Sequence, residues 1–151
     1  MEILLLAIVL LPLLTALGIK LVGKFINEIL LNFLTINSAL LSFTIASGMF
    51  VLLTMEKFEP IHFTFFTWLT SPEILFEFTL DGLSGIMMVL VTGLSVVIQI
   101  FSTSYMSQDE HYSKYFIYFN VFVFSMLLLV MSGNFLVMFF GWELVGLSSY
   151  L

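Results

Sequence analysis

Long apolar stretches separated by short polar segments dominate this chain. Four of them occupy residues 3–22, 29–55, 83–105 and 115–131, and another runs from 135 to 151. A stretch of about 20 apolar residues spans a bilayer as an α-helix. Apolar and polar residues do not alternate in them, as they would in the strands of a membrane barrel. The pattern predicts an all-α integral membrane protein with four transmembrane helices and the start of a fifth.

The segment at about 61–80 breaks this pattern. Two short runs there, 61–68 and 74–80, are rich in β-branched and aromatic residues and are separated by Thr70-Ser-Pro-Glu73. Such runs around a proline-containing turn are typical of a β-hairpin. We therefore expect a short hairpin on the membrane surface between the second and third helices, where it could dock on a neighbouring subunit. An ordered interhelical loop is the alternative.

The fifth apolar stretch is short for a membrane span. At 1.5 Å per residue, positions 135–151 reach about 25 Å, less than the hydrocarbon thickness of about 30 Å. We therefore interpret residues 1–151 as a single N-terminal fragment of a larger membrane subunit. On this interpretation, the remaining helices are supplied by another chain or have been lost from this one.

Composition supports the membrane assignment and narrows the chemistry. Charged residues make up 9% of the chain, against about 25% in soluble domains, and hydrophobic residues make up 61%. There is no cysteine, and the two histidines, His62 and His111, lie outside the apolar stretches. We expect no cofactor, no metal and no redox centre on this chain. The net charge of −6 argues against nucleic acid as a partner, because nucleic acid requires a basic surface.

The lysines give an orientation. Lys20 and Lys24 follow the first span and Lys114 precedes the fourth, so the first and third loops are predicted to lie on the positive side of the membrane. Lys57 lies in the second loop among four glutamates. That loop is expected on the opposite side, together with the N-terminus.

Glu143 is the strongest candidate for a functional residue. It is the only ionisable charge between positions 134 and 151. Charges in hydrocarbon are rare and mark ion or proton pathways by default, so Glu143 predicts proton or ion transfer. A glutamate that only bonds a neighbouring helix is the structural alternative. Ser148 and Ser149 could line water near Glu143 or simply pack, and Gly146 offers room for a close partner.

Three sequence runs carry a family resemblance. They are Leu80-Asp-Gly-Leu-Ser-Gly-Ile-Met87, Phe101-Ser-Thr-Ser-Tyr-Met-Ser-Gln-Asp109 and Gly141-Trp-Glu-Leu-Val-Gly-Leu-Ser-Ser-Tyr-Leu151. In order and spacing they resemble the antiporter-like subunit 5 of NADH:ubiquinone oxidoreductase (respiratory complex I), called subunit L in bacteria. That family has two inverted repeats of helices, an architecture common among transporters. The chain is similar to its first four helices and part of the fifth.

The resemblance implies a function and a site. The glutamate of the Gly-Trp-Glu run is a proton-transfer residue in the family, so Glu143 takes that role, and its usual lysine partner lies beyond Leu151. Two departures are Leu144, where many members carry glycine, and Gln99, where others carry histidine or an acid. Gln99 is therefore given no protonic role.

The whole protein implied is the distal proton-pumping membrane subunit of a proton-translocating NADH:ubiquinone reductase. FMN and iron–sulfur clusters would belong to other subunits of that complex, with no redox catalysis on this chain. Expected partners are membrane lipid, other complex I membrane subunits and a separate chain carrying the remaining helices. The expected location is the mitochondrial inner membrane, or alternatively a bacterial plasma membrane. Two alternatives remain: the large subunit of a multi-subunit sodium/proton antiporter, and a structural membrane piece without pumping activity.

Overall fold

The expected architecture of helices and one hairpin is confirmed. The computed structural model describes residues 2–23, 25–55, 59–70 and 73–151. Its elements are α1 (Glu2–Val22), α2 (Glu28–Met55), β1 (Ile61–Thr70), β2 (Glu73–Leu80), α3 (Gly82–Tyr105), α4 (Tyr112–Val130) and α5 (Phe135–Tyr150). The first four helices are long and apolar enough to cross a membrane, and α5 is apolar but shorter. The predicted turn residues Ser71 and Pro72 lie outside the described residues.

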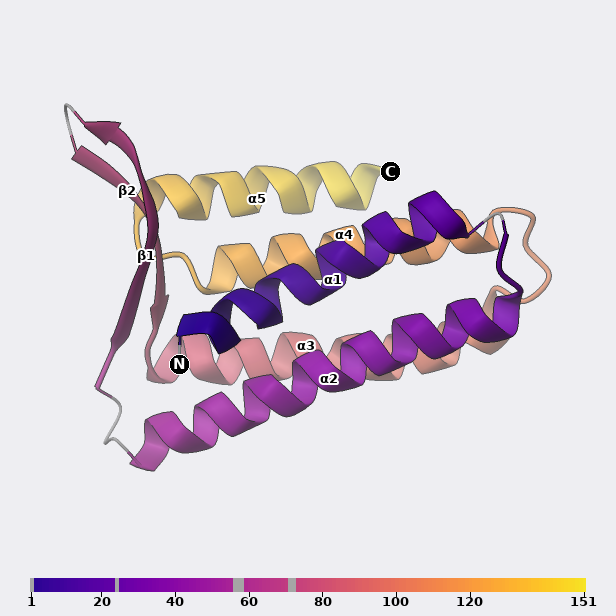
Figure 1. Ribbon diagram of the computed structural model, residues 1–151, viewed down its shortest axis with the longest axis horizontal. Helices are drawn as coiled ribbons and strands as arrows, with labels where there is room; N and C mark the ends of the chain where they lie inside the picture. Colours follow the sequence, from indigo (N-terminus) through magenta and orange to yellow (C-terminus); the bar gives the residue numbers. More distant parts are fainter. Residues whose placement is uncertain (1, 24, 56–58, 71–72) are drawn as a thin grey trace.

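The helices lie side by side in one bundle, and the hairpin lies across one end of it (Figure 1). The strands β1 and β2 are antiparallel, with Ile61 opposite Leu80 and Thr70 opposite Glu73. The hairpin covers the end at which α1 begins and α4 ends (Figure 1). The alternative of an interhelical loop without strands is wrong.

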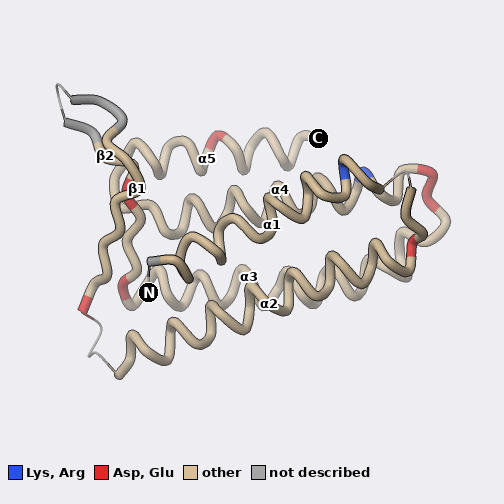
Figure 2. The backbone as a smooth tube through the Cα atoms, viewed as in Figure 1, with Lys and Arg blue, Asp and Glu red and all other residues tan. Residues whose placement is uncertain are grey.

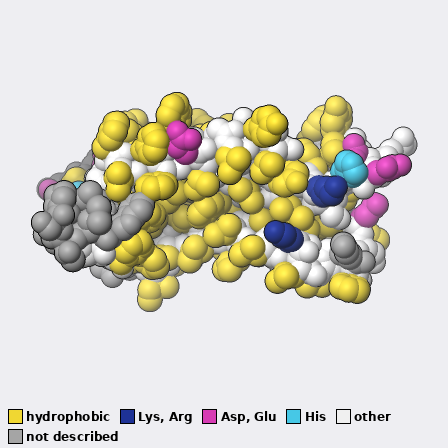
Figure 3. All heavy atoms as spheres, turned by 90° about the horizontal axis from the view of Figure 1, so that it is seen from above, with side chains coloured by type: hydrophobic (Ala, Val, Ile, Leu, Met, Phe, Trp, Pro, Cys, Tyr) yellow, Lys and Arg dark blue, Asp and Glu magenta, His cyan; other side chains and the backbone are white. Residues whose placement is uncertain are grey.

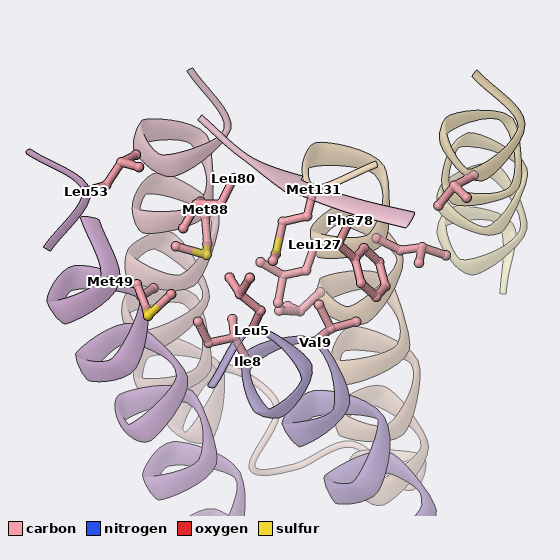
Figure 4. Close-up of a cluster of buried hydrophobic side chains, with 14 residues drawn as sticks. Leu5, Ile8, Val9, Met49, Leu53, Phe78, Leu80, Met88, Leu127 and Met131 are labelled. Atoms are coloured by element: carbon pink, nitrogen blue, oxygen red, sulfur yellow. The ribbon is translucent and has the colours of Figure 1, made fainter. Parts of the chain in front are cut away.

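The largest core cluster lies beneath the hairpin. Buried side chains from α1, α2, α3 and α4 meet there, and β2 adds Phe78 and Leu80 (Figure 4). Lipid tails are as apolar as these side chains, so close packing rather than water exclusion holds such helices together. Glycines on α3 allow this closeness: a Cβ at Gly85 would lie 2.9 Å from the ring of Phe50 on α2. The hairpin therefore completes the core.

Hydrogen bonds between side chains also join the spans. The hydroxyl of Thr15 on α1 donates to Ser38 on α2 at 2.6 Å, and the hydroxyl of Tyr112 on α4 donates to Asn32 on α2 at 2.6 Å. Polar residues of the second span thus pack against other helices, as expected for hydroxyl and amide groups in membrane bundles. Further bonds of this kind join Gln99 to Asn120 and Ser102 to Tyr115 between α3 and α4.

The fourth helix begins earlier than the sequence predicted. It starts at Tyr112 rather than at 115, because the Tyr112 backbone N–H donates to the Asp109 carbonyl and its side chain is buried against the bundle. The polar run from 107 to 114 hid this first helical turn. The buried aromatic ring outweighs the polarity of its neighbours.

The described lysines gather at the end of the bundle opposite the hairpin (Figure 2). Lys20 and Lys114 line the same surface pocket between α1 and α4. The first and third connections therefore lie on one side, as the loop charges predicted, while the compartment on that side stays a prediction. Lys24 and Lys57 lie outside the described residues.

Asp81 joins the hairpin to α3 and caps that helix. The Ser84 backbone N–H and hydroxyl each donate to Asp81 Oδ1 at 2.8 Å, and the Asp81 N–H donates to Ser84 Oγ at 2.7 Å. This reciprocal arrangement is a capping box. The backbone hydrogen bond from Ser84, followed by the one from its side chain, lowers the pKa of Asp81 from its ordinary value of 3.8.

The cap predicts an acid-sensitive contribution to stability. Replacing Asp81 by Ala should lower the free energy of unfolding by about 1 kcal/mol at neutral pH. Because the folded-state pKa is depressed, the contribution of the charged cap is present above the unfolded pKa of 3.8 and is lost as the pH falls through the folded value. Thermal unfolding in lipid nanodiscs at several pH values measures this. Asp81→Asn is the control, since it keeps an acceptor but cannot titrate.

Candidate functional site

The candidate site lies on α5, whose first residues fix where the helix begins. Asn134 has an extended backbone (φ −148°, ψ 166°), and its Oδ1 accepts the Val137 N–H at 3.0 Å. Its carbonyl accepts the Met138 N–H, so the helical bonding starts there. Asparagine is among the preferred N-cap residues for this reason. The cap fixes the first turn of the helix that carries Glu143.

Gly141 sets how α5 faces α4. A Cβ at this position would lie 2.6 Å from the backbone N and Cα of Leu129, so the two helix backbones touch there. A glycine is required for this approach, as in other small-residue contacts between membrane helices. Because successive residues turn by about 100°, Glu143 lies about 200° further round the helix. The Gly141 contact therefore turns Glu143 away from α4.

Glu143 is accordingly exposed in this chain. Within the part of the chain that the structure describes, no hydrogen bond or ion pair to its carboxylate is present. The neighbouring Trp142 is 61% exposed. A Cβ added at Gly146, one turn along, would meet nothing within 4 Å. That this space receives a partner or water stays a prediction.

The surroundings of Glu143 are apolar. Exposed apolar side chains of α5 near it include Phe139, Trp142 and Leu147. Figure 3 shows hydrophobic side chains over much of this side of the molecule, with the described lysines nearer the end away from the hairpin. An unpaired carboxylate in such a setting is normally directed at protein or water. Among the described residues, none covers the face of α5 that carries Glu143.

The structure separates the residues that the sequence grouped around Glu143. Ser148 is buried and its hydroxyl donates to the Val145 carbonyl at 3.1 Å, so it packs within this chain. Ser149 is exposed. Tyr150, which the sequence analysis did not single out, is 87% exposed and lies two turns from Glu143 on the same face. The spacing of seven residues between Glu143 and Tyr150 could have indicated from the sequence that the two share a helix face.

Gln99 belongs to a different place in the bundle. It is buried between α3 and α4, where its Nε2 donates to Asn120 Oδ1 at 3.4 Å. Its Oε1 has no hydrogen-bond partner among the described residues. The hydrogen bond of Gln99 therefore goes to α4 and not to the helix that carries Glu143. Its amide is one of the polar links between spans.

The other described ionisable groups lie apart from Glu143 or pair on the hairpin. In the described ranges, no three His, Asp or Glu side chains gather in a way that could hold a metal ion. His62 and Glu77 on the hairpin form an ion pair, with Nδ1 and Oε1 3.0 Å apart, when the histidine is protonated. The Thr79 hydroxyl lies 3.1 Å from the same ring nitrogen. This pair lies on the exposed hairpin, away from the middle of α5.

Fold and site together define a multi-pass helical membrane protein with a carboxylate inside the apolar region of one helix. The comparisons with known proteins agree with this class. Residues 68–116 match the family model described as NADH-ubiquinone oxidoreductase (complex I), chain 5 N-terminus. The chain is a counterpart of the N-terminal part of that chain 5 and subunit L family.

Individual relatives extend the match over almost the whole chain. NADH-quinone oxidoreductase subunit L of Buchnera aphidicola is 38% identical over 148 residues, which cover 95% of this chain and 24% of the relative. NADH-ubiquinone oxidoreductase chain 5 of Rhizopus stolonifer is 37% identical over 148 residues, which cover 97% of this chain and 22% of the relative. This chain thus spans at most about a quarter of the length of these relatives.

A solved structure shows the same fold. A chain in the membrane-bound sulfane sulfur reductase, described as an archaeal respiratory membrane complex, matches 97% of this chain with a TM-score of 0.83. Sequence identity is 18%, and the match covers 29% of that chain. The helical arrangement is therefore shared by a protein of distant sequence.

The two glycines of α5 give a matched test of the packing. Gly141→Ala should separate α4 from α5 and lower the stability of the chain in nanodiscs by about 1–3 kcal/mol, as overpacking does. Gly146→Ala should leave stability unchanged or raise it by up to about 1 kcal/mol through helix propensity. Thermal unfolding of both variants measures the difference. Equal effects of the two substitutions would contradict the close α4–α5 approach.

Proposed function

We propose that this chain is the N-terminal portion of the distal proton-pumping membrane subunit of a complex I. In that role it contributes to proton translocation coupled to the oxidation of NADH by ubiquinone. The observation that carries the proposal is Glu143, an unpaired carboxylate on the open face of a membrane helix, within the Gly141-Trp-Glu143 run. The printed names of the relatives, NADH-quinone and NADH-ubiquinone oxidoreductase, support it.

The proposed chemistry is proton binding and release at Glu143. Desolvation favours the neutral form of a carboxyl group, and a nearby cation favours its ionised form. A cation that approaches Glu143 would therefore release a proton, and its withdrawal would allow another to bind. No cation of the described residues pairs with Glu143, and Lys20 and Lys114 line a pocket between α1 and α4. Figure 2 shows the described lysines near the end of the bundle opposite the hairpin. The cation would come from helices outside this chain.

Those helices form part of the proposal. The exposed face of α5 and the greater length of the relatives both support an additional set of helices against Glu143. We propose that they belong to a separate chain of the same membrane arm. Other subunits would hold the FMN and the iron–sulfur clusters, and this chain would perform no redox step. The membrane would be the mitochondrial inner membrane or, for a bacterial source, the plasma membrane.

Two other functions compete with this one. The large subunit of a multi-subunit sodium/proton antiporter would share the helical fold and the intramembrane acid. Gly141 before the Trp-Glu pair and Val145-Gly-Leu147 after it favour complex I. Sodium/proton exchange by a purified complex without redox subunits would establish the antiporter instead. A purely structural membrane piece would have no need of an open face around a carboxylate.

The central experiment replaces Glu143 by Gln in the assembled complex. We expect fewer protons pumped per NADH oxidised, because the amide has a similar shape but cannot bind and release a proton. Glu110→Gln is the matched control, since Glu110 lies in the exposed connection after α3 and should leave the ratio unchanged. Vesicle proton uptake measured together with NADH oxidation gives the ratio. An unchanged ratio in Glu143→Gln would support the structural role.

The proposed separate chain has its own test. Mass spectrometry of the intact purified complex should find this chain together with a second polypeptide, whose sequence continues with the rest of the fifth helix. A single polypeptide of the full length of the relatives would contradict the separate chain. That result would leave the proton-transfer proposal for Glu143 in place.

A further inference from the structure

The turn between α4 and α5 pairs with the hairpin. The Thr79 N–H donates to the Met131 carbonyl at 2.8 Å, and the Gly133 N–H donates to the Glu77 carbonyl at 2.8 Å. Phe78 and Ser132 face each other between these bonds as an antiparallel bridge. β2 therefore has partners on both edges, with β1 on one side and the α4–α5 turn on the other. The backbone that leads into α5 is therefore hydrogen-bonded to β2.

Asn134 continues this attachment with its side chain. Its Nδ2 donates to the Leu75 carbonyl of β2 at 2.6 Å, while its Oδ1 accepts the Val137 N–H of α5. A primary amide can do both at once, because it carries a donor and an acceptor on one rigid group. A carboxylate in the same place would accept only. Asn134 thus binds β2 and α5 through the two ends of one side chain.

The turn lies in direct contact with β2 at Gly133. A Cβ at Gly133 would lie 2.8 Å from both Glu77 Cγ and Thr79 Oγ1 and 3.0 Å from the Glu77 carbonyl oxygen. Only a glycine lets the turn come this close to β2. The hydrogen bond from Asn134 to Leu75 is therefore made against a strand already in contact with the turn.

α5 is attached at two points. Asn134 precedes the helix and bonds to β2, and Gly141, seven residues further on, touches Leu129 of α4. Together the two attachments fix the rotation of α5 about its axis and its position along that axis. Glu143 lies nine residues beyond the cap, about 13 Å along the helix.

We propose that Asn134 is a positioning residue for Glu143, and that through it the hairpin sets the rotation and depth of the carboxylate. This inference rests on the proposed function of Glu143. The hairpin lies outside the bundle end (Figure 1), whereas Glu143 lies within the apolar length of α5. A displacement of the hairpin would therefore move Glu143, because the Asn134 amide joins β2 to the start of α5. Asn134 itself touches no reacting proton.

The substitution Asn134→Asp separates capping from attachment. An aspartate still accepts the Val137 N–H and caps α5, but it cannot donate to the Leu75 carbonyl. Asn27→Asp is the matched control. Asn27 caps α2 in the same way, accepting the Leu30 N–H at 2.9 Å, and within the described residues its amide nitrogen donates to no group. Both variants are made in the assembled complex, with amounts normalised to intact complex on native gels.

The readout is the pH profile of protons pumped per NADH oxidised. Asn134→Asp should move its midpoint by about 0.5 pH units or more, which corresponds to a threefold change in proton affinity. Asn27→Asp should keep the wild-type midpoint, because a cap alone is affected. Asn134→Ser, a neutral cap too short to reach both partners, should reproduce the shift if Asn134→Asp fails to assemble.

Two comparisons separate this inference from the proposed function. If Glu143→Gln lowers the pumping ratio while both Asn134 variants keep the wild-type midpoint, the positioning role is wrong and the proton-transfer role stands. If Asn134→Asp shifts the midpoint equally in the wild type and in Glu143→Gln, the shift does not act through Glu143, which overturns the inference as well. A shift that disappears in Glu143→Gln supports it.

Discussion

Hydrocarbon offers no hydrogen-bond partner, and this constraint explains most of the molecule. Each helix satisfies its own backbone, which is why helices are the preferred spanning structure. Non-helical backbone must be placed at the end of the bundle or paired, and the hairpin meets both conditions: it lies across that end, and β2 is bonded on both edges. Polar side chains within the spans follow the same rule, as Thr15 with Ser38 and Tyr112 with Asn32 illustrate.

Glu143 is an exception to this rule, because its carboxylate has no hydrogen-bond partner among the described residues. The chain could have turned the carboxylate toward α4, where a polar partner could satisfy it. Instead Gly141 brings its own face against Leu129, and the helical geometry then directs Glu143 outward. The same glycine that gives close packing therefore leaves the acid without a partner among the residues that the structure describes. The contact between Gly141 and Leu129 thus both packs α5 against α4 and leaves Glu143 exposed.

The sequence predicted the spans well because the bilayer fixes their length, and it predicted the hairpin because β-branched and aromatic residues cluster around a proline turn. It found Glu143 because a charge within an apolar stretch is conspicuous.

The sequence did not predict the rotation of α5, since that helix is apolar on all sides and has no amphipathic pattern. The attachment of Asn134 to Leu75 joins residues 59 positions apart, so no local pattern could contain it. The start of α4 at Tyr112 was missed because the residues around it are polar, while its burial and its bond to Asn32 are contacts with other helices.

The attachments of α5 bear on how its carboxylate could exchange protons. A fixed carboxylate changes its proton occupancy only if its surroundings change, because burial and nearby charge decide which form is favoured. Asn134 holds the start of α5 to β2, Gly141 holds the helix against α4, and the side chain of Glu143 stays exposed. Movement is therefore better supplied by whatever covers that side chain than by α5 itself. In such an arrangement, α5 fixes the position of the carboxylate. A cation that moves on the opposite side would then change which protonation state of Glu143 is favoured.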